Sequence, residues 1–156
     1  IYHGEMLGSH GLWQKDLFYE PSVGVPLLVR APGTTPENVV CQTPVSLVQL
    51  FATMTDLCGV PTPAGLDGSS FADALRRPHE TRDADVFAGL DLNGPLAGYM
   101  IRAENFKYSY YRNDTPELYD LRADPEEMKN LAQLPEYKKK AQEMQARLFA
   151  WHRPAQ

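Results

Sequence analysis

The sequence contains no apolar run that approaches the roughly 20 residues needed to cross a bilayer. It also lacks a basic tract, and its formal net charge is −5, which argues against a nucleic acid as the main partner. We therefore expect neither a membrane nor a nucleic acid among its partners. No signal peptide is recognisable at the start, where a basic segment followed by an apolar one would stand.

Cysteine is nearly absent as well. Cys41 and Cys58 are the two cysteines, too few to define a disulfide framework. Both fall in or beside an apolar stretch with helical spacing, so we expect buried thiols. Two cysteines of this kind do not indicate a redox compartment. The sequence has no glycine-rich phosphate loop, no zinc-type Cys/His set and no Gly-x-Ser-x-Gly elbow. These absences exclude the best-marked classes of nucleotide-binding, zinc-binding and serine-hydrolase site.

The first fifteen residues hold the densest group of candidate site residues. His3, His10 and Lys15 lie there, together with glycines at positions 4, 8 and 11. Glycine lets a backbone turn sharply, imidazole binds metals or moves protons near neutral pH, and a lysine ammonium suits an anion. The pattern predicts a loop that presents a metal or an anion-binding cation. Ordinary loop histidines and a solvated lysine are the alternative, and the spacing alone gives the two interpretations equal weight.

Two patterns of hydrophobicity divide the chain near residue 80. Before it, residues 27–29 form a short apolar run between turn signals, as in a buried strand of a mostly parallel sheet. A charged, proline-containing stretch at 76–85 marks a boundary. Beyond it, short strands of a small antiparallel sheet are predicted at 86–88, 98–102, 106–111 and 117–121. We expect 1–80 to belong to a main α/β domain and 81–156 to form a C-terminal subdomain of sheet and helix.

Three of the predicted helices have clear boundary signals. One runs from Thr43, a candidate N-cap, to Cys58, with Gly59 as its C′ residue. A second is predicted from Asp124 to about Leu131, because Asp-Pro-Glu-Glu resembles a capping box. The last begins at a proline and carries one apolar stripe, which we expect to cover the sheet: Tyr137, Ala141, Met144, Leu148 and Trp151.

The opening residues resemble a known family. Residues 3–15, His-Gly-Glu-Met-Leu-Gly-Ser-His-Gly-Leu-Trp-Gln-Lys, are similar to the Asp-His-Gly-Glu-x-x-Gly-x-His-Gly-x-x-x-Lys stretch of the sulfatases, in the alkaline phosphatase superfamily. Further segments match in register, at 18–33, 43–61, 66–70 and 100–131. The resemblance implies an α/β protein, the C-terminal part of an alkaline-phosphatase-like fold, which ends in a small antiparallel sheet packed by a C-terminal helix.

The resemblance also implies roles for the site residues. His3 would be a ligand of a divalent cation, usually calcium, while Lys15 would act in catalysis and bind the sulfate group together with His10. Tyr2 stands where the family has a metal-binding aspartate. Sulfatases use a formylglycine nucleophile made from Cys or Ser in Cys/Ser-x-Pro-x-Arg, a motif that this chain does not contain.

We therefore expect the C-terminal portion of a sulfatase that hydrolyses a sulfate-ester small molecule or sugar. Because the sequence begins abruptly within the opening loop, we expect the natural N-terminus, the nucleophile and most of the metal site to lie upstream. We therefore expect the chain to be inactive alone, and we assign it no cellular compartment. A homo-oligomer is a further expectation, because the strand at 27–29 lacks neighbours. The alternatives are a phosphonate monoester or phosphodiester hydrolase of the same superfamily, and a non-catalytic binding module, which Tyr2 favours.

Overall fold

The computed structural model describes residues 3–15, 17–80, 84–91 and 97–152. The chain forms two compact units, of which the first joins Ile1–Pro26 to Asp85–Gln156 and the second comprises Leu27–Ala84. The units therefore group the opening loop with the C-terminal part of the chain. The domain division expected from the sequence, 1–80 and 81–156, stays a prediction.

The first unit is built on one antiparallel sheet, as predicted. Its strands are β1 (Val86–Leu90), β2 (Gly98–Ala103), β3 (Phe106–Tyr111) and β4 (Glu117–Asp120), in the spatial order β1-β2-β3-β4. Each strand pairs antiparallel with its neighbour in sequence. The hairpin between β2 and β3 turns at Glu104, whose φ of 54° lies in the left-handed region.

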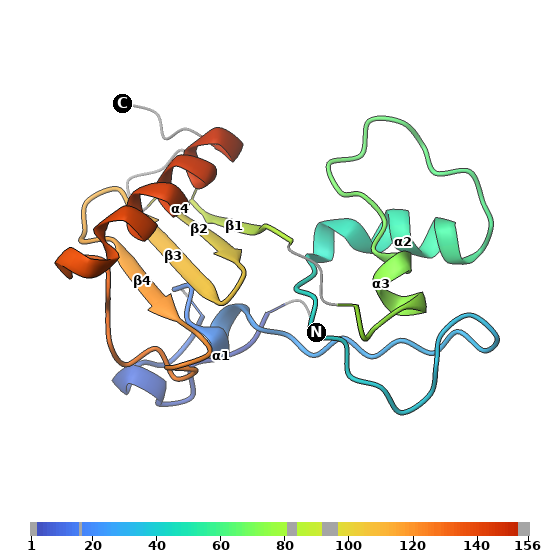
Figure 1. The fold of residues 1–156 in the computed structure, drawn as a ribbon, viewed down its shortest axis with the longest axis horizontal. Coiled ribbons are helices and arrows are strands. Elements are labelled where there is room, and N and C mark those ends of the chain that lie inside the picture. The colour runs from blue at the N-terminus through green and yellow to red at the C-terminus, as the bar shows by residue number, and fades with distance from the viewer. Residues whose placement is uncertain (1–2, 16, 81–83, 92–96, 153–156) are drawn as a thin grey trace. The chain divides into compact units, whose positions relative to one another are not determined.

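Helix α4 (Lys138–Trp151) covers one face of this sheet and follows the 3-10 turn η3 (Pro135–Tyr137) (Figure 1). Met144 and Leu148 of its apolar stripe are fully buried in the main core. They share that core with Ile101, Tyr108 and Leu118, which stand in one cross-strand row of the sheet. Burying each such side chain contributes about 1.5–3 kcal/mol, so the predicted stripe is what holds α4 on the sheet.

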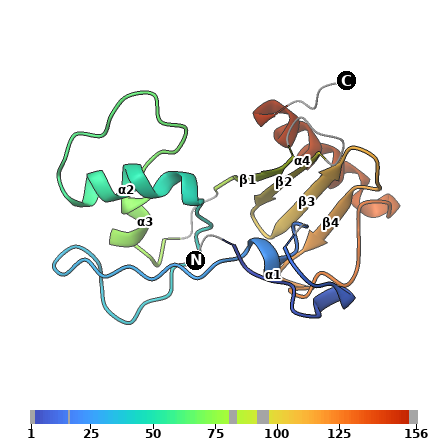
Figure 2. The ribbon, with the colours of Figure 1, turned by 180° about the vertical axis from the view of Figure 1, so that it is seen from behind.

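The other face of the sheet is covered as well, which the sequence did not predict. Arg102, Lys107 and Tyr119 form the next cross-strand row. Lys107 and Arg102 pair with the side chain of Glu20, and the ring of Tyr119 contacts that of Tyr19. Figure 2 shows the short helix α1 (Glu20–Val23) on that side. Strand β3 is therefore buried on both faces, whereas its alternating pattern predicted a half-buried strand.

The prediction of a helix from Asp124 to Leu131 was wrong. Residues 124–131 form turns without a helix. Glu127, read in the sequence as a capping-box residue, has a φ of 58° and is 1% exposed. Its carboxylate pairs with Lys107 and accepts the backbone N–H of Glu20, so it serves a tertiary contact in place of a cap.

The second unit contains the predicted central helix, in shortened form. It comprises a 3-10 turn η2 (Leu47–Gln49) and α2 (Leu50–Leu57). The capping box belongs to Ser46 and Gln49, so the helix starts three residues later than the predicted cap at Thr43. Its end is as predicted: Gly59 has a φ of 66°, and its N–H and that of Val60 bond back to the last turn.

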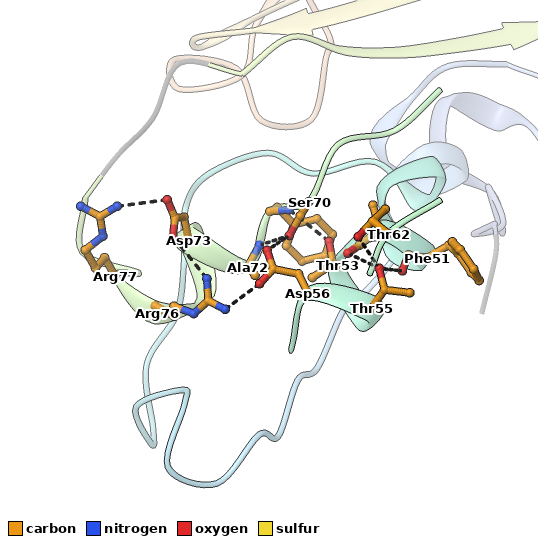
Figure 3. A network of polar contacts seen from close by, with 12 residues as sticks. Phe51, Thr53, Thr55, Asp56, Thr62, Ser70, Ala72, Asp73, Arg76 and Arg77 are labelled. Atoms are coloured by element: carbon orange, nitrogen blue, oxygen red, sulfur yellow. Dashed lines mark hydrogen bonds and ion pairs between the residues drawn. The ribbon is translucent and has the colours of Figure 1, made fainter. Parts of the chain in front are cut away.

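A polar network joins α2 to the short helix α3 (Ala72–Arg76) (Figure 3). Asp56 accepts hydrogen bonds from Arg76 Nη2 at 2.7 Å and from Ser70 Oγ at 2.7 Å. These two partners hold the pKa of the Asp56 carboxyl below its usual value. Behind it, the buried hydroxyl of Thr53 accepts the backbone N–H of Phe71 at 3.0 Å. These bonds link α3, and the two residues before it, to α2.

Two local predictions for this unit were wrong. Residues 27–29 form no strand, and the middle one, Leu28, is 89% exposed. A buried parallel strand needs partners on both sides, and the described residues of this unit contain no other strand. Cys58 is exposed and Cys41 is half-buried, so the expected pair of buried thiols is not formed. None of the described helices is long and apolar enough to cross a membrane.

Candidate active site in the opening loop

The opening loop doubles back on itself through its own backbone. The N–H of Met6 donates to Gln14 O at 2.8 Å, and that of Gly8 donates to Leu12 O at 2.8 Å. The turn at its tip, η1 (Ser9–Gly11), follows Gly8, whose φ of 97° suits glycine. Met6 is 2% exposed and anchors the loop. Because the loop returns on itself, residues at its two ends come close together.

His3 and Lys15, both predicted as site residues, are in contact. Lys15 Nζ lies 2.8 Å from His3 Nε2, and His3 Nδ1 lies 2.8 Å from Gly4 O. A carbonyl oxygen can only accept, so Nδ1 carries the proton and Nε2 presents its lone pair to the ammonium group. The loop thus sets the imidazole of His3 beside the ammonium group of Lys15. Tyr2 lies outside the described residues.

His10 has a different environment. It sits in the turn at the tip of the loop, and its ring stacks on that of Tyr19 with centroids 3.9 Å apart. Tyr19 in turn donates its hydroxyl to Glu117 Oε1 at 2.9 Å. Burial, together with the Glu117 charge, raises the pKa of Tyr19. Among the contacts described, His10 packs on Tyr19 and not on the His3–Lys15 pair, so its predicted role in substrate binding stays a prediction.

His3 fits the role of a single metal ligand. Its Nδ1–H donates to a backbone carbonyl, the kind of outer contact that fixes the tautomer of a metal-binding histidine. The single lone pair of Nε2 faces Lys15 Nζ in this structure, so a cation would have to take the place of that ammonium group. No group of three or more His, Cys, Asp or Glu side chains placed to hold a metal occurs in the described part of the chain.

Ser22, a residue that sequence reasoning missed, bonds to both ends of the loop. Its carbonyl accepts the N–H of Gly4 at 2.7 Å, and its hydroxyl donates to Lys15 O at 2.9 Å. The chain at Gly4 runs so close to α1 that a Cβ there would lie 2.0 Å from Pro21 O. Glycine at position 4 is therefore required by close approach of two backbone segments.

Four charged side chains tie α1 to the sheet. Glu20 Oε1 lies 3.0 Å from Lys107 Nζ, and Glu20 Oε2 lies 3.2 Å from Arg102 Nη1. The backbone N–H of Glu20 donates to Glu127 Oε2 at 2.6 Å. Lys107 Nζ lies 2.5 Å from Glu127 Oε1, a charge pair whose angle does not suit a hydrogen bond. Burial raises the pKa of Glu127 in spite of Lys107.

No signal in the single sequence marked these supporting residues. Lys107 occupies a polar position of an alternating strand, which predicts a solvent-facing side chain. Glu127 occupies a capping position, and Ser22 follows a proline in an unremarkable stretch. Only the pairing of β3 with its neighbours, and the return of residues 18–23 to the far face of the sheet, bring them together.

An antiparallel sheet of four strands covered by a C-terminal helix is the architecture that the resemblance to the sulfatases implies for this part of the fold. The family model described as "N-sulphoglucosamine sulphohydrolase, C-terminal" matches residues 8–153, and the chain belongs to this family of sulfatase C-terminal domains. The resemblance to the sulfatases inferred from the sequence and the expected fold class are both confirmed.

Relatives and solved structures agree with this assignment. Arylsulfatase K of Rattus norvegicus is 35% identical over 143 residues, which cover 83% of this chain and 25% of the relative. A structure in complex with its substrate D-glucosamine-2-N,6-O-disulfate superposes with a TM-score of 0.84 at 28% identity, over 96% of this chain and 32% of that one. Phosphonate monoester hydrolase of Agrobacterium radiobacter gives 0.74 at 28% identity, over 95% and 33%. The chain thus spans about a quarter of the length of this curated relative.

Proposed function

We propose that the chain is the C-terminal portion of a sulfuric ester hydrolase and contributes Lys15 and His3 to its active site. The observation that carries the proposal is the 2.8 Å contact between Lys15 Nζ and His3 Nε2 in a member of the sulfatase family. An acid-base or metal role for one residue alone would not need this contact. Two groups brought together across a loop form part of one site.

Each residue has a defined task in this proposal. The Lys15 ammonium binds the sulfate group and neutralises the charge that develops on its oxygens as the bond from sulfur to the ester oxygen breaks. His3 Nε2 would bind a divalent cation, calcium by the family resemblance, once the Lys15 ammonium has moved from that nitrogen to the sulfate, and the bound cation would polarise the sulfate. The nucleophile, a formylglycine in sulfatases, comes from outside this chain. The products are an alcohol and sulfate.

The test uses the protein that carries this chain at full length. We expect release of sulfate from an aryl sulfate or a sulfated glucosamine, since a similar structure holds D-glucosamine-2-N,6-O-disulfate as its substrate. Lys15→Ala should lower kcat/KM at least 100-fold, by analogy with loss of one charge-stabilising donor, about 10²–10³-fold. Lys139→Ala, an exposed lysine on α4, is the matched control and should change nothing.

The 156-residue chain by itself should not turn over sulfate esters, because its sequence lacks the Cys/Ser-x-Pro-x-Arg motif. Turnover by the purified chain above that of its Lys15→Ala variant would contradict this part of the proposal. Absence of turnover by the full-length protein on every ester would instead favour the non-catalytic binding module.

A phosphonate monoester hydrolase is the second candidate. It is favoured by the likeness to the Agrobacterium radiobacter enzyme, at a TM-score of 0.74. A lysine ammonium suits a phosphonate monoester as well as a sulfate ester, because both present charged oxygens at the reacting centre. Comparing kcat/KM for an aryl sulfate and an aryl phosphonate in the full-length protein separates the two functions.

A further inference from the structure

The short helix α1 contacts both ends of the opening loop, strands β2 and β3, and Glu127 in the turn after β4. We infer that Ser22 is a positioning residue, which sets Lys15 against His3, and that the buried Lys107–Glu127 pair holds Ser22 in place through Glu20. The consequence for catalysis rests on the proposed function, whereas the positioning itself does not.

The first step is the double contact of Ser22. Its hydroxyl donates to the carbonyl of Lys15 at 2.9 Å, and its carbonyl accepts the N–H of Gly4 at 2.7 Å. Gly4 directly follows His3 and accepts the Nδ1–H of its ring at 2.8 Å. One residue therefore fixes the backbone beneath the lysine and the backbone that orients the imidazole.

The second step is that the Lys15 side chain cannot position itself. Lys15 is exposed, and its four-carbon stem gives it many rotamers. Backbone bonds join the two arms of the loop only between Met6 and Gln14 and between Gly8 and Leu12, among the residues that the structure describes. Ser22 is 3% exposed, so water does not compete for its hydroxyl. Its bond is the contact that locates the Lys15 carbonyl.

The third step is the support of α1 itself. A helix of four residues is not stable alone, because forming the first turn is unfavourable. Glu20, its first residue, is held by Lys107 and Arg102 through its carboxylate and by Glu127 through its N–H. Lys107 and Glu127 are each 1% exposed. The rigid sheet thus fixes α1, and α1 fixes the loop.

The first experiment measures the contact between Lys15 and His3 and does not depend on enzyme activity. In ¹⁵N spectra of histidine side chains of the protein, His3 Nε2 should have the shift of an unprotonated nitrogen that accepts a hydrogen bond. Lys15→Ala defines the shift when that bond is lost. Ser22→Ala should move the His3 Nε2 signal at least halfway to this reference. Glu20→Gln, which keeps the backbone N–H and the side-chain size, should move it in the same direction.

The matched control is Thr53→Val in the second unit. Thr53 is 2% exposed, and its hydroxyl donates to a backbone carbonyl, Gln49 O, at 2.8 Å, much as Ser22 does. This variant loses an equally buried hydroxyl and should leave His3 unchanged. Wild-type His3 signals in both Ser22→Ala and Glu20→Gln, with the fold intact by circular dichroism, would overturn the inference.

The second experiment uses sulfate-ester turnover by the full-length protein. Ser22→Ala should lower kcat/KM about tenfold, because one lost hydrogen bond lets the lysine leave the reactive geometry. Ser22→Thr, which restores the hydroxyl, should recover most of that loss, and Thr53→Val should show none. Equal turnover by wild type and Ser22→Ala would overturn the inference. Absence of turnover in the wild type would overturn the proposed function alone, since the His3 signals still decide the positioning.

Discussion

Lys15 Nζ lies 2.8 Å from His3 Nε2, although twelve positions separate the two residues in the chain. The contact requires that the loop close, and closure requires that residue 4 pass directly against α1. The geometry at Gly4 and Ser22 is therefore as much a part of the candidate site as the two functional groups. The first prediction therefore concerns Gly4.

Gly4→Ala should disrupt the loop by collision. A Cβ at position 4 would lie 2.0 Å from the backbone oxygen of Pro21, which cannot move without shifting α1. Gly33→Ala is the control, because its φ of 77° strains an alanine while no atom lies within 4 Å of the new Cβ. Strain of that kind costs about 1–2 kcal/mol. Urea unfolding should give a larger loss for Gly4→Ala, and an equal or smaller loss would contradict the model of close approach.

Lys107→Ala should lower the free energy of unfolding by about 3–5 kcal/mol, because it leaves the buried carboxylate of Glu127 without its cation. Lys139→Ala removes an exposed lysine and should stay within about 0.5 kcal/mol. Urea denaturation of both variants measures the difference. Similar values for the two lysines would mean that the buried pair does not anchor α1.

The antiparallel sheet and α4 could be predicted because local pattern and tertiary packing agree there. The stripe through Met144 and Leu148 has helical spacing, and these side chains are buried on the sheet. The predictions failed where long-range contacts decide the local conformation. Glu127 adopts a positive φ to reach Lys107, and the capping signal at 124–127 is overridden.

The candidate site was predictable only in part, for a similar reason. His3 and Lys15 were found by their chemistry and by the family pattern of the loop. Ser22 and Glu20 were missed because a serine or glutamate near a proline has no distinctive spacing. Their roles come from contacts with residues up to 107 positions away, which a single sequence does not encode in any local signal.

Leu148→Ala and Leu28→Ala should differ sharply in this chain. Leu148 is fully buried against the sheet, and its truncation should cost about 2–5 kcal/mol through lost burial and a cavity. Leu28 is 89% exposed, so its truncation should cost less than about 0.5 kcal/mol. Unfolding followed by circular dichroism measures both. A large loss of unfolding free energy in Leu28→Ala would support the strand predicted at 27–29.

Glu127 should make the stability of the chain fall as pH rises. Its pKa in the folded protein lies above the ordinary value of 4.5, chiefly because burial disfavours the charged form. Between 4.5 and that raised pKa, the folded state binds more of this proton than the unfolded state does. Its contribution to stability is therefore fully present below pH 4.5 and is lost as pH rises through the folded pKa.

Glu127→Gln removes this titration. Relative to that of Glu127→Gln, the unfolding free energy of the wild type should fall by up to about 1.4 kcal/mol for each pH unit across that window. Glu126→Gln changes the exposed neighbouring glutamate and should leave the pH profile parallel to that of the wild type. Urea unfolding in steps between pH 4 and pH 8 gives the three curves. A difference that grows in favour of the wild type with pH would mean that Lys107 stabilises the Glu127 carboxylate by more than its burial costs.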